Sequence, residues 1–175
     1  GSTQRFSFRI TGRYYGQDGI YKVGQENFHR YNFRAKIGVK VTDWLSFDSN
    51  TYFYRNIYNQ PFVTTSSTIP SSIQYHGFPI FPVYNPDGSY TAGAARGGYA
   101  LFNENKTLQQ NNNLSFAETI GMDIKIIKDV LNLHTDFTYK VHRNGILRYR
   151  GQNMYSLAPG SVIYDTPQES TYKSV

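Results

Sequence analysis

The chain of 175 residues contains no cysteine, which excludes disulfides, thiolate nucleophiles and thiolate metal sites. It also lacks an apolar run near the roughly 18 residues that suggest a transmembrane helix. The opening residues, GST, have neither the basic start nor the apolar centre of an export signal. The sequence has no phosphate-binding glycine loop, HExxH motif or nucleophile elbow, and no acid–base pair stands out. We therefore expect neither an enzyme nor a cofactor.

Aromatic and basic residues are what the chain has in excess. It contains 16 tyrosines and 12 phenylalanines, which are bulky, amphipathic side chains that favour strands. It also contains 18 lysine and arginine residues against 12 acidic residues, a formal net charge of +6. Such a balance is typical of proteins that bind nucleic acid, a membrane surface or an anionic ligand. The cations are scattered along the chain, so the net charge alone does not choose between these partners.

Five segments alternate between apolar and polar side chains with the period of two that is characteristic of β-strands. In RYNFRAKIGVKV, residues 30–41, every second side chain is apolar or small, and most of those between them are cationic. We predict an all-β, antiparallel up-and-down meander whose strands pair in sequence order. The predicted strands cover residues 4–16, 27–41, 44–58, 113–127 and 130–150. The residues predicted to face lipid from one side of this meander are Tyr31, Phe33, Ile37, Val39, Leu131, Leu133 and Phe137.

The connections between these segments alternate between short and long. Tight turns are predicted at Thr42 with Asp43 and at Lys128 with Asp129, where the aspartates supply the turn chemistry. The longest connection runs over residues 58–113, and the chain after residue 150 is polar and contains proline and serine. Trp44 lies at a short turn and tyrosines gather at the opposite strand ends, as in two interfacial girdles. These features favour a segment of a large transmembrane β-barrel with long extracellular loops over a soluble β-sandwich.

The polar side of the meander carries histidines and cations. His134, Asp136 and His142 share one predicted strand, but the two histidines lie roughly 26 Å apart, too far to share an ion, and we expect no metal site. Nucleic acid is one candidate partner for these cations. Pairing with acidic residues inside a barrel is the favoured alternative, so we expect no nucleic-acid binding. The cations on the first two strands are Arg5, Arg9, Arg13, Arg30, Arg34, Lys36 and Lys40.

Three stretches of the chain resemble one protein family. Residues 14–56 are similar to the strand, Q-D/E-G-I loop, F-x-R-Y-x-x-R strand and T-x-W-L turn of that family. NPDGSY, residues 85–90, is similar to a common loop motif, and YALFNENKT followed by IGMDIKIIKDVLNLHTDFTY is similar to a later strand pair. In this order, and over most of its length, the chain resembles the SusC/RagA-like TonB-dependent transporters of Gram-negative outer membranes.

The resemblance implies a barrel of ~22 strands, of which residues 1–175 would supply about five. We recognise no plug domain, TonB-binding box or closing strand, so the chain is expected to be an internal part of the barrel. The resemblance also implies active import of oligosaccharides or peptides across the outer membrane. The protein would contact the lipid of that membrane, and a SusD-like surface lipoprotein would act as its lid. TonB would act through an N-terminal region that this chain does not include. A soluble β-sheet module that binds glycans is the alternative function.

The long connection at residues 60–112 is expected to lie outside the cell and to contact ligand or the lid lipoprotein. Within it, residues 83–91 carry a turn signal, because Pro86 presets φ, Asp87 bonds back to the backbone and Gly88 accepts a positive φ. Residues 64–72 and 109–113 are predicted to be irregular. Aromatic faces stack on sugars and on peptide side chains, although the alternative is that they only pack the loop against itself. The candidate contact residues are Tyr75, His76, Phe78, Phe81, Tyr84, Tyr90 and Tyr99.

Overall fold

The computed structural model describes the chain except for residues 2, 4, 22–23, 65–66, 69–79, 81, 105, 129, 153, 159, 165–168 and 175. The described residues are dominated by strands, with two short helices. The strands are β1 (Phe6–Asp18), β2 (Asn27–Lys40), β3 (Leu45–Gln60), β4 (Phe62–Thr64), β5 (Ser67–Thr68), β6 (Thr107–Ile127), β7 (Leu131–Arg150), β8 (Met154–Ala158), β9 (Ser161–Tyr164) and β10 (Glu169–Ser174). The helices are α2 (Ala92–Arg96) and α3 (Tyr99–Asn103).

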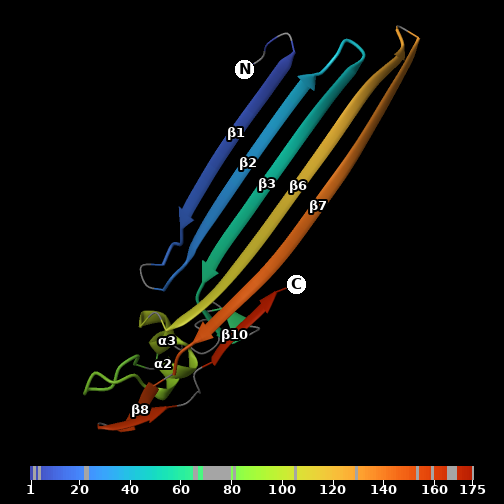
Figure 1. Cartoon of the computed structure of the whole chain (residues 1–175). Coiled ribbons are helices and arrows are strands. Elements are labelled where there is room, and N and C mark those ends of the chain that lie inside the picture. Colours follow the sequence, from blue (N-terminus) through green and yellow to red (C-terminus); the bar gives the residue numbers. More distant parts are fainter. Residues whose placement is uncertain are drawn as a thin grey trace. The chain divides into compact units, whose positions relative to one another are not determined.

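The predicted antiparallel meander is confirmed. The five long strands lie side by side in sequence order, β1-β2-β3-β6-β7, and β10 adds a sixth strand beside β7 (Figure 1). Strand positions also follow the prediction to within a few residues, except that β6 begins at Thr107 and not at residue 113. The short strands form two further sheets, one of β4 with β5 and one of β8 with β9.

The chain divides into two compact units. We call the first the sheet unit, which comprises Gly1–Gly16, His29–Asn56 and Asn113–Asn144. We call the second the loop unit, which comprises Gln17–Phe28, Ile57–Asn112 and Gly145–Val175. Each long strand therefore contributes residues to both units, and each unit is described separately below.

The sheet unit is a single layer with two chemically different faces. Its polar face carries the cations named above, and its apolar face carries the side chains that alternate with them along each strand. The apolar face is exposed: Ile37 retains 38% of its surface, Phe8 44% and Phe137 68%. Among the described residues of this unit, Ala35 is the one buried apolar residue. A single layer has no second layer to cover it, which accounts for the exposure of these apolar side chains.

A carboxylate interrupts the apolar face at Glu118, on β6. The neighbouring strand β3 also has a polar side chain on this face, Ser49, and the Ser49 hydroxyl donates to Glu118 Oε1 over 2.6 Å. Both residues are half-buried. The two interruptions of the apolar pattern thus lie side by side and satisfy each other, which lowers the cost of placing a carboxylate on this face.

The turn between β2 and β3 lies where the sequence predicts it, but a different residue shapes it. The Leu45 amide donates to Thr42 Oγ1 over 3.0 Å, so the threonine hydroxyl closes the turn. Asp43 instead pairs with Lys40 Nζ at 2.8 Å, and this cation holds the pKa of the Asp43 carboxyl below its usual range. The prediction that Asp43 supplies the turn chemistry is therefore wrong. In the second turn the Val130 amide donates to the Ile127 carbonyl over 3.1 Å, while Asp129 lies outside the described residues.

The loop unit has a small core that sequence analysis did not identify. Its members are three alanines on α2 and α3 and three larger apolar residues: Phe62, Ala94, Ala95, Ala100, Leu101 and Phe102. Thr91 caps α2, because its Oγ1 accepts from the Ala94 amide over 3.2 Å. Thr107 is 2% exposed, and its Oγ1 accepts from the Phe62 amide over 3.3 Å and donates to the Phe62 carbonyl. One threonine side chain thus joins β6 to the start of β4.

The prediction that residues 64–72 and 109–113 are irregular is wrong where the structure describes them, because Thr64 ends β4 and Ser67 with Thr68 forms β5. Residues 109–113 are not irregular but belong to β6, where Gln110 donates to Asn59 Oδ1 over 2.9 Å and Arg148 Nε donates to Gln109 Oε1 over 2.8 Å. The chain after residue 150, where the sequence analysis identified no strand, forms β8, β9 and β10. β10 pairs antiparallel with the end of β7, in a register that places Glu169 opposite Arg150 and Ser174 opposite Gly145. In both places backbone pairing and cross-strand polar contacts replace the apolar alternation on which the prediction depended.

Two glycines with the same backbone angle allow a matched test of the loop-unit core. Gly24 and Gly88 both have φ of +83°, where any other L-residue is strained. A methyl group on Gly24 would overlap the buried Phe102 ring, whereas nothing lies within 4 Å of one on Gly88. We expect Gly88→Ala to lower the free energy of unfolding by about 1 kcal/mol and Gly24→Ala by about 2 kcal/mol. Chemical denaturation of both variants would measure the difference, and equal losses would contradict the packing of Phe102 against Gly24.

Candidate functional site

The polar face of the sheet unit concentrates cations on β1 and β2. Arg34 Nε donates to Asn50 Oδ1 over 3.1 Å, and Arg30 Nε donates to Asn56 Oδ1 over 3.2 Å. Both acceptors are neutral amides on β3, so these bonds orient the guanidinium groups without neutralising them. Positions 5–13 and 30–40 on this face contain no carboxylate. The two strands therefore present a strip of positive charge, which we call the cation strip: Arg5, Arg9, Arg13, Arg30, Arg34, Lys36 and Lys40.

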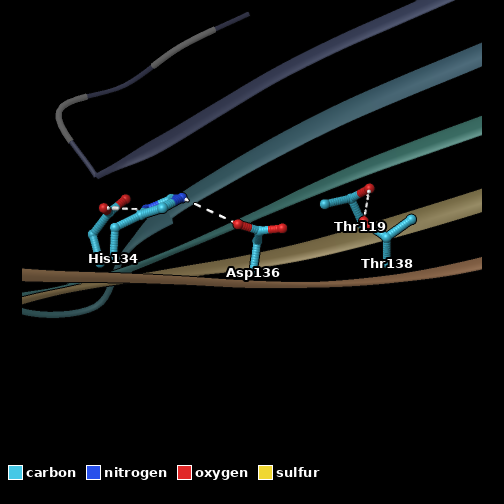
Figure 2. A network of polar contacts seen from close by, with 5 residues as sticks. Thr119, His134, Asp136 and Thr138 are labelled. Carbon is cyan, nitrogen blue, oxygen red and sulfur yellow. Dashed lines mark hydrogen bonds and ion pairs between the residues drawn. The ribbon is translucent and has the colours of Figure 1, made fainter.

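The acidic groups of the polar face lie on the other strands. His134 Nδ1 lies 2.6 Å from Asp123 Oδ1, and His134 Nε2 lies 3.8 Å from Asp136 Oδ1 (Figure 2). All three side chains are more than half exposed. The sequence placed His134 and Asp136 on one face, but Asp123 was missed because its approach depends on the register between β6 and β7. These two carboxylates therefore contact His134 and not the cations of the cation strip.

Hydroxyl groups continue the polar contacts between β6 and β7. Thr119 and Thr138 share a hydrogen bond of 2.9 Å (Figure 2), and Ser115 contacts His142 Nδ1 at 2.6 Å. The two histidines of β7 therefore have separate partners on β6. Within the described part of the chain, no group of three or more histidine, aspartate or glutamate side chains could hold a metal ion.

Two adjoining open cavities, of about 470 Å³ and about 380 Å³, hollow the sheet unit beside the cation strip. They share Ser7, Gly38 and Asp48. Gly38 has no side chain to fill the space, and a methyl group there would lie 2.7 Å from Ser7 Oγ. The larger cavity is lined by three cations and three carboxylates: Arg5, Lys40, Lys125, Asp43, Asp48 and Asp123. The smaller one is lined by Arg9 and Lys36 together with Asp48.

Two tyrosines of β3 lie on the same polar face. The rings of Tyr52 and Tyr54 are nearly parallel, with centroids 6.5 Å apart and planes inclined by 11°. The guanidinium carbon of Arg30 lies 5.7 Å from the centroid of the Tyr54 ring, which is a cation–π contact. Tyr52 retains 40% of its surface. The polar face therefore offers aromatic surface directly beside the cation strip.

The structure brings together two of the seven candidate loop residues. The ring centroids of Tyr84 and Tyr90 lie 5.0 Å apart, and the two residues form an isolated antiparallel bridge. Tyr84 is 49% exposed and Tyr90 is half-buried, and burial raises the pKa of the Tyr90 hydroxyl. Tyr99 is half-buried on α3 and makes no ring contact with either of them in the described structure. Tyr75, His76, Phe78 and Phe81 lie outside the described residues.

The turn that carries Tyr84 and Tyr90 is anchored by polar contacts. Its predicted chemistry is confirmed, since Asp87 Oδ1 accepts from the Ser89 amide over 3.1 Å and Gly88 has a positive φ. Hydrogen bonds from the Ser89 hydroxyl, the Ser89 amide and the Gly160 amide lower the pKa of the Asp87 carboxyl. Asn85 Nδ2 also donates to the Ser156 carbonyl over 3.1 Å. The turn is therefore tied to β8 and to the connection between β8 and β9.

Sequence analysis also missed a polar cavity of about 270 Å³ in the loop unit, which includes Asp18, Glu26, Phe28 and Tyr58. The Tyr58 hydroxyl donates to Glu26 Oε1 over 3.3 Å, and no sequence motif links these two positions.

Among the described residues, no helix is both long and apolar enough to cross a membrane. Comparison of the chain with protein-family models gives no match, and comparison with curated proteins gives none either.

Proposed function

We propose that the chain forms part of the wall of an outer-membrane, TonB-dependent importer of oligosaccharides or peptides that works with a SusD-like surface lipoprotein. The observation that carries this proposal is the sheet unit, a single layer of long strands with one exposed apolar face and one polar face. A soluble sheet of this length would bury its apolar face against a second layer. Lipid is the partner that buries such a face without a second protein layer.

The aromatic residues at one end of the apolar face support a membrane boundary there. Tyr14 stacks beside His29 and Tyr31, with ring centroids 6.1 Å and 5.2 Å away. The Tyr14 hydroxyl lies 2.9 Å from His29 Nδ1, so the cluster combines apolar rings with polar tips. Groups of this kind favour the membrane–water interface, where one end of the side chain stays hydrated.

The polar face supports the other half of the proposal, an aqueous interior. Its hydrogen bonds run from strand to strand, for example from Arg34 to Asn50 and between Thr119 and Thr138. Charged side chains at these depths require water or polar partners, which the lumen of a large barrel provides. Transport and the lid lipoprotein enter the proposal from the family resemblance of the sequence.

Adjacent residues on opposite faces of β2 provide a direct test. Since the chain has no native cysteine, Ile37→Cys and Lys36→Cys can each be labelled with an environment-sensitive fluorophore in the protein reconstituted in lipid vesicles. We expect brominated lipids to quench the label at position 37 strongly and the label at position 36 weakly. An aqueous quencher should show the reverse order if the channel is open to it.

The comparison of the two sites also tests the alternative function. A soluble glycan-binding module would leave both labels unquenched by lipid and would remain in solution without detergent. That result would reject the membrane proposal, because the two sites are neighbours in sequence and differ chiefly in the face they occupy.

A further inference from the structure

We propose that the polar face of β1, β2 and β3 binds acidic oligosaccharides, those that carry uronate or sulfate groups. This inference deepens the proposed function, on which it rests, by naming the charge class of the imported ligand. The starting observation is the cation strip, in which seven cations occupy the neighbouring strands β1 and β2. Positions 5–13 and 30–40 contain no aspartate or glutamate. Like charges on adjacent strands repel, so the strip is stabilised by an anionic partner.

The salt bridges of the described carboxylates reach Lys40, at one end of the strip, but not Arg9 or Lys36. Asp123 and Asp136 contact His134 on the far strands, and Asp43 pairs with Lys40 at the turn. Asp48 lies across Gly121 of β6, where an added methyl group would overlap its carboxylate. Because β6 and β2 flank β3 on opposite sides, the Asp48 carboxylate lies toward β6, while the residue also lines both cavities. Within the described structure, Arg9 and Lys36 form no salt bridge.

The shape of the surface provides room for a ligand at the strip. The cavity lined by Arg9 and Lys36 also includes Ser7, Asn50 and Thr119, so hydroxyl and amide groups accompany the two cations, together with one carboxylate, Asp48. It shares Ser7, Gly38 and Asp48 with the larger cavity, so the two hollows are neighbours on the sheet. Guanidinium and ammonium groups bind carboxylate and sulfate oxygens, while neutral donors and acceptors suit sugar hydroxyls.

The tyrosines favour a sugar over an acidic peptide as the carrier of the negative charge. Tyr52 and Tyr54 present nearly parallel rings on the same face, and Arg30 lies against one of them. Flat aromatic surfaces stack on the apolar faces of pyranose rings, which a polyglutamate chain lacks. Nucleic acid also stacks on aromatics, and it is therefore included as a competitor in the test.

The test measures equilibrium binding of a galacturonate hexamer to the protein in detergent by calorimetry. Maltohexaose, a glutamate hexapeptide and a thymidylate hexamer are the comparison probes, and we expect the galacturonate hexamer to bind at least tenfold more tightly than each. Binding should weaken as salt is raised, because the contacts are ionic and exposed.

Charge-neutralising variants locate the site. We expect the double variant Arg9→Gln/Lys36→Gln to weaken galacturonate binding about tenfold. Lys140→Gln is the control for loss of a charge elsewhere on the same face, on β7, and should change binding less than twofold. Tyr52→Ala should weaken binding of galacturonate but leave any binding of the glutamate peptide unchanged. Circular dichroism of each variant confirms that it is folded.

The outcomes separate this inference from the proposed function. Equal binding of maltohexaose and the galacturonate hexamer, or tighter binding of the peptide or the nucleic acid, would overturn the inference. An equal loss in Lys140→Gln and in the double variant would also overturn it, because the effect would then reflect net charge. Lipid quenching at Ile37→Cys in the same preparation reports on the membrane wall independently, so failure of binding with intact quenching rejects the acidic-ligand inference alone.

Discussion

Replacing Ile37 with arginine is expected to destabilise the protein in a bilayer by about 2–4 kcal/mol. Ile37 lies on the apolar face of β2, about midway between the aromatic cluster at Tyr31 and the turn at Trp44, and retains 38% of its surface in the structure. In the proposed barrel that surface contacts lipid hydrocarbon, where a guanidinium group loses its hydration. The strand geometry prevents the side chain from turning to the polar face, because successive side chains alternate.

Tyr31→Arg is the matched comparison, since it places the same charge on the same face of the same strand. Tyr31 belongs to the aromatic cluster with Tyr14 and His29, at the proposed membrane boundary. An arginine there reaches water and should cost about 0–1 kcal/mol. Reversible denaturation of both variants in lipid vesicles would measure the two losses. Equal losses at the two positions would contradict a bilayer and favour a soluble core.

Replacing Thr107 with valine is expected to lower the free energy of unfolding of the loop unit by about 2–4 kcal/mol. The two side chains have nearly the same shape, so the change removes a hydroxyl and leaves the packing volume intact. In the native protein that hydroxyl bonds both the amide and the carbonyl of Phe62, in a site where Thr107 is 2% exposed and Phe62 is 6% exposed. Valine leaves both backbone groups buried without these partners.

Thr107→Ser supplies the control because it keeps the hydroxyl and removes only a methyl group. We expect it to retain most of the stability that valine loses, with a cost of about 1 kcal/mol for the missing methyl. Denaturation monitored by amide hydrogen exchange at Phe62 would separate local from global loss. If valine proved as stable as threonine and serine less stable, packing of the methyl group, and not the hydroxyl, would hold this junction together.

The sequence by itself determined the meander. In β2 and β7 nearly every second side chain is apolar, and this period exists in no other regular structure, so the strands and their faces follow from local pattern alone. Pairing of β2 with β3 and of β6 with β7 followed from the short connections at residues 41–44 and 128–130, which bring neighbouring strands together directly. The turn at residues 83–91 was also predictable, because Pro86, Asp87 and Gly88 each restrict the backbone locally.

Tertiary structure alone decided which polar groups meet. Glu118 with Ser49 and Asp123 with His134 are pairs set by strand register, and register depends on the whole sheet and not on either residue's neighbours in sequence. Tertiary structure also placed residues 109–113 in a strand, where the side-chain amides of Gln110 and Gln109 bond to β3 and β7. It added β10 as a sixth strand of the sheet. These segments have little apolar alternation, because their strand conformation is held by hydrogen bonds to partners that are distant in the chain. The helices α2 and α3, of five residues each, are too short to show a helical period and are held by the buried alanines and Leu101.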